Sequence, residues 1–191
     1  MSNTNSTANV TAGKPMVGGA IFRAPIGTTV PTAADSSLSG SYVCLGYLSE
    51  DGLTNSNSPE SEAIKAWGGD TVLNLITAKE DTFGMTFIEA MNADVLTTVY
   101  GDNNVTGSSV ESGLSIKANS KDLSEYVFVV DMVLKGDVIK RIVIPKGKVT
   151  EVGEISYTDS DAVGYEVTIS ATPDTDGNTH YEYIKKSSTT L

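Results

Sequence analysis

The chain has 191 residues, with 24 acidic and 13 basic side chains and a formal net charge of -11 at pH 7. Its length suits one domain with tails, its single cysteine excludes an internal disulfide, and Cys44 with the lone His180 gives too few ligands for a usual zinc site. The acidic charge disfavours binding to nucleic-acid phosphates and to anionic membranes. Without a membrane-spanning stretch or an export signal, we expect a soluble protein that binds no metal or cofactor.

The chain begins with a segment that is poor in large side chains. Residues 1–19 are rich in Ser, Thr, Asn and Gly, and such a segment buries too little apolar surface to offset the entropy lost on ordering. We therefore predict a flexible N-terminal arm. Between residues 19 and 47, short apolar runs separated by Pro25, Pro31 and small residues predict two short strands.

A long polar segment follows, over residues 49–70. It has turn-forming residues at both ends and few apolar side chains. We predict a long loop, and loops of this length inside a compact domain are usually functional. The next two runs, residues 71–79 and 82–91, are predicted to form a hairpin around a turn at Glu80 and Asp81.

One helix is predicted, over residues 92–100, because Asn92 can cap it, apolar residues recur at helical spacing, and Gly101 can end it. A hairpin with a turn at Gly136-Asp137 follows, and its second strand is predicted to close at Pro145. The remaining strands are predicted at residues 114–119, 148–157, 163–171 and 179–185. Seven to nine strands with one helix predict a mainly β protein, an antiparallel sandwich or barrel with one short flanking α-helix.

No pattern in the sequence predicts catalysis. The run from Asp174 to Asn178 contains turn residues but lacks the spacing of a calcium loop. His180 is interpreted as a surface histidine on a strand, because no nucleophile or pocket is indicated near it. The neighbours Glu80 and Asp81 are interpreted as solvated turn charges, since adjacent residues on a strand point to opposite faces. We therefore expect no enzymatic activity.

Trp67 is the only tryptophan, and it lies at the end of the long polar segment, before Gly68 and Gly69. One interpretation is a core anchor that ties the loop back to the sheet. The other is an interface residue, because Trp buries a large area with few rotatable bonds. The sequence leaves both interpretations open.

Four blocks of the sequence resemble the major tail tube proteins of long, non-contractile-tailed bacteriophages. They are GKPMVGGAIFRAPIGTTVPTAA (13–34), LGYLSEDGLTNSNSPESEAIKAWGGDTV (45–72), TFIEAMNADVLTTVYGDNNVTG (86–107) and GYEVTISATPDTDGNTHYEY (164–183). The GYLSEDG and KAWGGDTV ends of the second block and the strand and helix of the third are the most specific. The resemblance covers most of the chain.

The resemblance implies a tail-tube β-sandwich over residues 20–185 that assembles into stacked rings, usually of six, whose channel conducts DNA. In this family the long loop, here 49–70, reaches the neighbouring ring, and the arms, here 1–19 and the tail 186–191, add contacts. The residues expected in the ring-to-ring contact are Leu53, Asn55, Asn57, Glu60, Glu62, Ile64, Lys65 and Trp67. Its implied partners are further copies, the tape measure, terminator and tail-tip proteins, and passing double-stranded DNA without specific binding. Its implied location is the virion tail, after synthesis in the host cytoplasm.

The acidic charge and this role together predict a net negative channel wall, because a basic lining would hold the phosphates of a passing duplex. The candidate lumen-facing acids are Glu80, Asp81, Glu125 and Asp131. A different interpretation is that the acids only keep the unassembled subunit soluble. An alternative function is a ring-forming carrier of a contact-dependent, type VI-like bacterial secretion system, which shares the tube fold, and an enzyme is the third hypothesis.

Overall fold

The computed structural model describes residues 4–187, which form two antiparallel sheets, one α-helix and one short 3-10 turn (η1, Thr7–Asn9). The large sheet contains β1 (Lys14–Pro15), β2 (Ile21–Pro25), β3 (Val43–Cys44), β4 (Leu48–Lys65), β5 (Thr71–Phe87), β8 (Glu125–Leu134), β9 (Val138–Val152), β10 (Tyr165–Ala171) and β11 (Tyr181–Lys186). Its strand order is β3-β2-β8-β9-β10-β5-β4, with β1 on β8 and β11 on β9. The small sheet pairs β6 (Val105–Thr106) with β7 (Ser115–Ile116).

Strand β9 joins two halves of the large sheet. One edge of β9 pairs with β8, and the other edge pairs with β11 along residues 138–143 and with β10 along residues 147–152. The register of β8 against β9 shifts at Pro145, and an irregularity of this kind tolerates a residue that has no N–H to donate. The prediction that the strand ends at Pro145 is therefore wrong: β9 continues to Val152.

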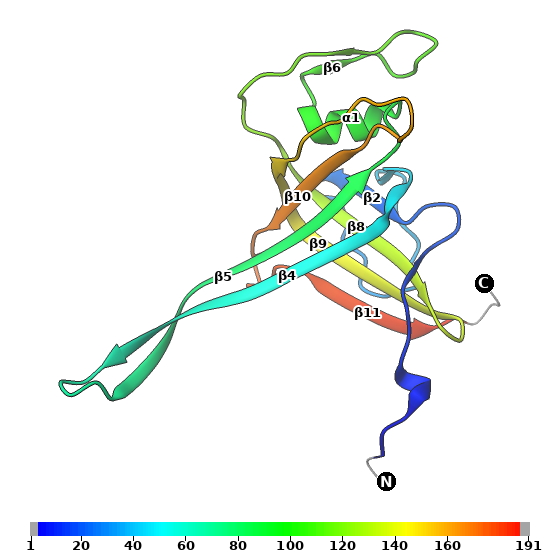
Figure 1. Cartoon of the computed structure of the whole chain (residues 1–191). Helices are drawn as coiled ribbons and strands as arrows, with labels where there is room; N and C mark the ends of the chain where they lie inside the picture. The colour runs from blue at the N-terminus through cyan, green and yellow to red at the C-terminus, as the bar shows by residue number, and fades with distance from the viewer. Residues whose placement is uncertain (1–3, 188–191) are drawn as a thin grey trace.

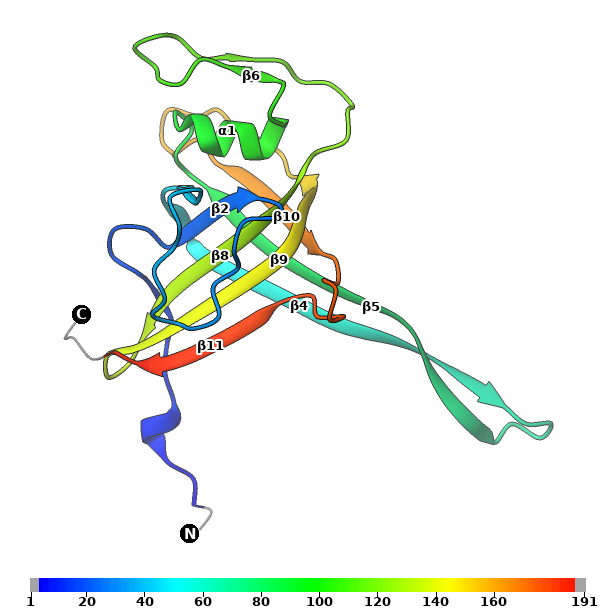
Figure 2. The ribbon, with the colours of Figure 1, turned by 180° about the vertical axis from the view of Figure 1, so that it is seen from behind.

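The two halves of the sheet lie over one another, with β10, β5 and β4 on one side and β2, β8 and β9 on the other (Figures 1 and 2). Large side chains from both halves, including Phe83, Phe87, Phe128 and Ile144, form one buried apolar cluster between them. Gly147 lies where the halves approach, because a Cβ there would come within 3 Å of both Phe128 and Ile169. The predicted class, mainly β and antiparallel with one flanking helix, is confirmed.

The helix α1 (Ala93–Tyr100) also confirms its prediction. The Asn92 side chain accepts a hydrogen bond from the Asp94 N–H at 3.0 Å, and Gly101 follows the last helical residue with φ 96°. Arg23 of β2 fixes the helix to the sheet through ion pairs with Asp94 at 3.8 Å and with Asp102 at 3.5 Å. The Tyr126 hydroxyl donates to Asp102, and burial together with this carboxylate raises the pKa of Tyr126 to about 12.

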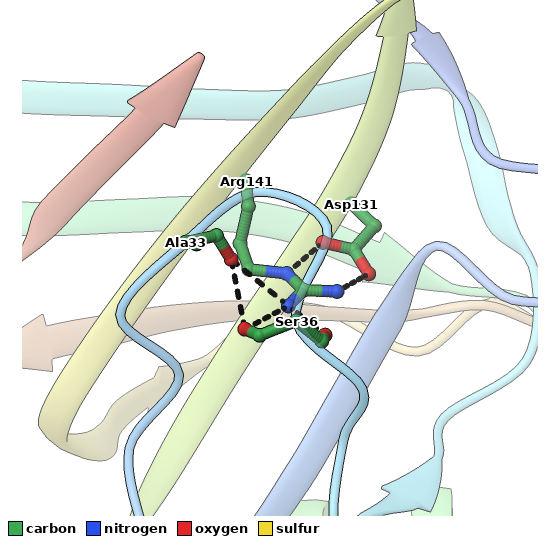
Figure 3. Close-up of polar contacts among 4 residues, drawn as sticks. All are labelled: Ala33, Ser36, Asp131 and Arg141. Carbon is green, nitrogen blue, oxygen red and sulfur yellow. Dashed lines mark hydrogen bonds and ion pairs between the residues drawn. The ribbon is translucent and has the colours of Figure 1, made fainter. Parts of the chain in front are cut away.

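A buried ion pair fixes the segment between β2 and β3 (Figure 3). The Arg141 guanidinium binds the Asp131 carboxylate through two hydrogen bonds, at 2.6 and 2.8 Å. It also donates to the Ala33 and Ser36 carbonyl oxygens at 3.2 and 2.6 Å. Because both charges are compensated and nearly every donor has an acceptor, the pair is tolerated inside the protein.

The hairpin of β8 and β9 is confirmed, with a turn at residues 135–137 in which Gly136 and Asp137 both have positive φ. Two short strands, β2 and β3, are also found where the sequence predicts them. The predicted strand at 114–119 is reduced to the two residues of β7. The long polar segment and the run after it differ more strongly from their predictions.

Candidate assembly surface

The segment predicted as a long loop is one strand of a long hairpin. Residues 48–65 form β4, which has 18 residues and pairs with β5, which has 17. The predicted turn at Glu80 and Asp81 is wrong, because β5 runs through it without interruption. Only residues 66–70 form the connection between β4 and β5, and the hairpin projects from the body of the protein (Figure 1).

Burial divides β5 into an inner and an outer half. In the inner half, residues 81–87, every second residue is buried, so that Phe83, Met85 and Phe87 enter the core. In the outer half, residues 71–80, every residue is exposed, although the sequence is more apolar there than in the facing strand. The exposed apolar side chains of the outer hairpin are Ile64, Trp67, Val72, Leu73, Leu75 and Ile76.

Cross-strand pairing sorts the outer hairpin into two unlike faces, since paired residues project to the same side. Glu60, Glu62 and Ile64 of β4 pair with Ala78, Leu75 and Leu73 of β5, and Ser58 pairs with Glu80 on the same side. We call this side the acidic face; its large side chains are Glu60, Glu62, Glu80, Ile64, Leu73 and Leu75. The other side includes Lys65, Lys79 and Ile76.

A β-bulge sets this arrangement. The register shifts between Glu60, which pairs with Ala78, and Ser61, which pairs with Ile76, so that Thr77 has no direct partner. An extra residue reverses the alternation of side chains along a strand. Leu73 and Leu75 therefore project to the side opposite the core-facing residues of the inner half, whereas an unbroken alternation would keep them on the core side.

Trp67 lies in the turn at the tip of the hairpin and is fully exposed. The turn is closed by a hydrogen bond from the Ala66 N–H to the Asp70 carbonyl at 2.8 Å. Gly68 and Gly69 have φ of 117° and 97°, a region that favours glycine. The interpretation of Trp67 as a core anchor is wrong, because this turn holds the side chain away from the sheet.

The residues predicted for the ring-to-ring contact fall into two groups. Leu53 and Asn55 lie at the root of the hairpin: Leu53 packs against the core, and the Asn55 side chain donates to Asp81 at 2.8 Å. The others are exposed along β4 and its turn, namely Asn57, Glu60, Glu62, Ile64, Lys65 and Trp67. The contact residues predicted from the sequence do not include Leu73, Leu75 and Ile76, which are exposed apolar residues of β5. Their segment lacks the regular alternation of apolar and polar residues seen in TFGMTF, and this was the signal in the sequence that set them apart from a core strand.

A polar cluster closes the root of the hairpin. The Asp81 carboxylate is 1 % exposed and contacts the His180 Nδ1 and the Thr179 hydroxyl, both at 2.5 Å. Burial alone would raise the pKa of Asp81, but hydrogen bonds from Thr179, His180 and Asn55 outweigh it and lower the pKa. His180 also packs edge-on against Phe83 at 5.3 Å. The interpretation of His180 as a surface histidine is wrong, because the β10–β11 connection places its ring against this carboxylate.

The four carboxylates considered for a channel wall are in different environments. Asp81 and Asp131 are buried, the first in the polar cluster and the second against Arg141, so neither presents charge at the surface. Glu80 is exposed on the hairpin. Glu125 is partly exposed and lies 3.5 Å from the Lys146 ammonium. Of these four carboxylates, Glu80 and Glu125 are the two that reach the surface of the monomer.

The N-terminal segment is partly ordered on the sheet. Residues 14 and 15 form β1 on β8, and the Met16 N–H donates to the Asp131 carbonyl at 3.2 Å. The Thr11 hydroxyl accepts from the Lys135 N–H at 2.8 Å. The prediction of a free arm is therefore too long at its C-terminal end. Residues 1–3 of the arm and 188–191 of the tail lie outside the described residues, whereas Lys186 belongs to β11.

Metal-ligand clusters and membrane-spanning helices have no candidate within residues 4–187. No three His, Cys, Asp or Glu side chains of this part are grouped so that they could hold a metal ion. None of its helices combines the length and apolarity needed to cross a membrane.

Comparison with known proteins gives one positive finding. A family model described as phage tail tube protein matches residues 2–190, nearly the whole chain. A search of the curated proteins gave no match.

Proposed function

Because the chain belongs to the phage tail tube protein family, we propose that it is the subunit that assembles into stacked rings, each of six copies, around a channel for DNA. The observation that carries this proposal is the outer half of the β4–β5 hairpin, which exposes six large apolar side chains. Exposed apolar patches on a monomer usually mark an interaction surface. The subunit would act in the virion tail, together with the tape measure, terminator and tip proteins.

The hairpin is proposed to make the contact between successive rings. A projecting element that inserts into a different surface of the next copy is a heterologous contact, and such a contact repeats along an axis. The proposed contact residues are the exposed ones predicted from the sequence together with two from β5: Asn57, Glu60, Glu62, Ile64, Lys65, Trp67, Leu73 and Leu75. Leu53 and Asn55 would support the contact from the root of the hairpin.

The lining of the channel is proposed to be acidic, with Glu80 and Glu125 as its candidates. A duplex carries about one phosphate charge per 1.7 Å, so a basic wall would bind it through the release of counterions. An acidic wall repels the duplex within a Debye length of about 8 Å. Such a wall would let DNA pass without specific binding.

Shortening the hairpin tests its role. Ser58 and Glu80 are cross-strand partners, so residues 59–79 can be replaced by Asn-Gly, which favours a two-residue hairpin turn. We expect a monomer that melts near the wild-type temperature but forms no tubes, as seen by sedimentation and negative-stain electron microscopy. Tubes of normal length from this variant would contradict the proposed function.

A further inference from the structure

One face of the outer hairpin carries unpaired negative charge, which a positively charged surface would complement. The acidic face has three carboxylates, Glu60, Glu62 and Glu80, beside its three apolar side chains, whereas Lys65 and Lys79 project to the other side. These three carboxylates form no ion pair with any residue in the range 4–187. The acidic face therefore combines unpaired negative charge with exposed apolar area.

A second surface of the same chain has the opposite character. It lies where β1, the turn between β8 and β9, and the end of β11 meet, and it contains Lys14, Lys135, Lys140, Lys185 and Lys186. We call it the basic end. Its carboxylates are Asp137 in the turn, Glu182, which lies 2.8 Å from Lys140, and Asp35, which lies 2.6 Å from Lys185. Cross-strand pairing places Lys140 and Lys186 on the side of Ile184, together with Glu182, and Lys14 and Lys185 on the opposite side, with Ile139. Over both sides, five lysines stand against three carboxylates in a chain whose net charge is -11.

The basic end also offers apolar area. Ile184 is 60 % exposed, and its cross-strand partner is Lys140. Residues two apart on a strand project to the same side, so Lys186 flanks Ile184 on this face of β11. Among the residues described, Lys14, Lys135 and Lys186 have no ion-pair partner. The basic end thus pairs an exposed apolar side chain with uncompensated positive charge, as the acidic face does with negative charge.

The two surfaces lie on opposite sides of the molecule. The tip of the hairpin and the end of β11 project away from each other in both views (Figures 1 and 2). One copy therefore cannot satisfy both surfaces by itself. A head-to-tail contact between different surfaces satisfies both of them in every ring of an open stack except the two terminal rings, each of which leaves one surface unpaired.

We propose that the outer part of the acidic face of one copy, with Glu60 and Glu62, docks on the basic end of a second copy in the adjacent ring, whereas Glu80, at the root of the hairpin, stays outside this contact. This inference rests on the proposed stacking role of the hairpin and names the surface that receives it. Opposite charge fixes the orientation and register of the contact, and Ile64, Leu73 and Leu75 bury apolar area beside Ile184. Because the two surfaces differ, all rings of the stack point in the same direction. Inverting one ring relative to its neighbours would bring like charges together.

Charge reversal tests the pairing with the full-length protein. One variant has Glu60→Lys and Glu62→Lys, a second has Lys135→Glu and Lys186→Glu, and a third combines all four substitutions and so restores the net charge. The matched control has Glu154→Lys and Asp159→Lys, two exposed residues without a hydrogen bond or ion pair among the described contacts. Each monomer is first checked by thermal melting, and assembly is then followed by sedimentation over a range of protein concentrations.

Each single-surface reversal should raise the concentration needed for assembly by more than about tenfold, because it juxtaposes like charges. The combined variant should assemble within about threefold of wild type, as coupled residues do in a double-mutant cycle, and the control should behave like wild type. If the combined variant assembles no better than the single-surface variants, the pairing is wrong. Reversals that behave like the control would also overturn it.

Two further comparisons separate a failure of this inference from a folding defect and from a failure of the proposed stacking role. If a reversed chain fails to fold, the neutral versions Glu60→Gln with Glu62→Gln, and Lys135→Gln with Lys186→Gln, provide the same cycle with a smaller expected coupling. If the shortened hairpin abolishes tubes while the reversals have no effect, the hairpin stacks on another surface and only this inference fails. Normal tubes from the shortened hairpin would instead remove the stacking role itself.

Discussion

The inner and outer halves of the β4–β5 hairpin are built from the same two strands and differ in what stabilises them. The inner half alternates buried and exposed residues and places Phe83, Met85 and Phe87 in the core. The outer half has the backbone ladder but no core beneath it. Because an isolated two-stranded hairpin is only marginally stable in water, the outer half adds little to the fold, and its apolar residues are better explained by a contact outside the monomer.

The largest difference between the halves should appear when one aromatic residue in each is truncated. Phe83→Ala removes a fully buried side chain, and we expect it to lower the free energy of unfolding by about 3–5 kcal/mol. Trp67→Ala removes a fully exposed one, so the free energy of unfolding should change by less than about 0.5 kcal/mol. Chemical denaturation of the two monomers measures both values.

The same two variants should rank differently when tube formation is measured in place of the free energy of unfolding. Trp67→Ala is expected to weaken or abolish tube formation from a monomer of normal stability, as a residue at the centre of an interface does. A large loss of monomer stability in Trp67→Ala would mean that the tip packs on the body of the protein. The distinction between the two halves would then fail.

A smaller effect is expected at the boundary between the halves, where the Asp81 side chain of β5 forms hydrogen bonds with Asn55 of β4 and with Thr179 and His180 of the β10–β11 connection. Asp81→Asn keeps the shape but removes the charge, and we expect it to cost about 1–3 kcal/mol. The pKa of Asp81 is lowered in the folded protein, by these hydrogen bonds acting against burial. Its charged form therefore contributes stability above the unfolded pKa, and this contribution disappears as the pH falls through the folded pKa.

Measuring the free energy of unfolding of wild type and Asp81→Asn from neutral pH down to the acid range checks this sign. The difference should be largest at neutral pH and should shrink as the pH falls below the ordinary aspartate range. Asp51→Asn, at an exposed residue on the same hairpin, is the matched control, and at neutral pH it should cost less stability than Asp81→Asn. A gap that widens toward acid pH would contradict the assignment.

The elements that the sequence predicts well have local signals. The helix has its cap and its terminal glycine within ten residues, and the β8–β9 hairpin has two apolar runs around a turn. Strand β4 has no such signal: its Ser, Asn, Glu and Pro residues resemble a loop, and the strand exists because β5 pairs with it at the edge of the sheet. Pro59 is acceptable there because an edge strand need not donate on its outer side.

The candidate site is harder to predict because its parts are defined by pairing between distant residues. Asp81 and His180 are 99 residues apart and meet only in the folded chain. The apolar run at 72–76 suggests a strand buried in the core. No sequence pattern distinguishes such a strand from one that is exposed in the monomer and buried only on assembly. The bulge at Thr77, which decides the face to which Leu73 and Leu75 project, depends on the register with β4. Trp67 and the carboxylates Glu60 and Glu62 were predicted as contact residues from the family resemblance.

The smallest effect on the monomer, and the finest test of the two faces, comes from two neighbouring residues of the outer half. Leu75 belongs to the acidic face and Ile76 projects to the other side, and both are exposed. Leu75→Ser and Ile76→Ser should each change the free energy of unfolding by less than about 0.5 kcal/mol, since neither contributes to the core. If only the acidic face docks, Leu75→Ser should raise the concentration needed for assembly about tenfold, which corresponds to about 1.4 kcal/mol per contact, and Ile76→Ser should leave it nearly unchanged. Equal losses in the two variants would show that the hairpin is enclosed on both sides, as in a slot between two neighbouring copies, and the single acidic face would no longer explain how the stack is held together.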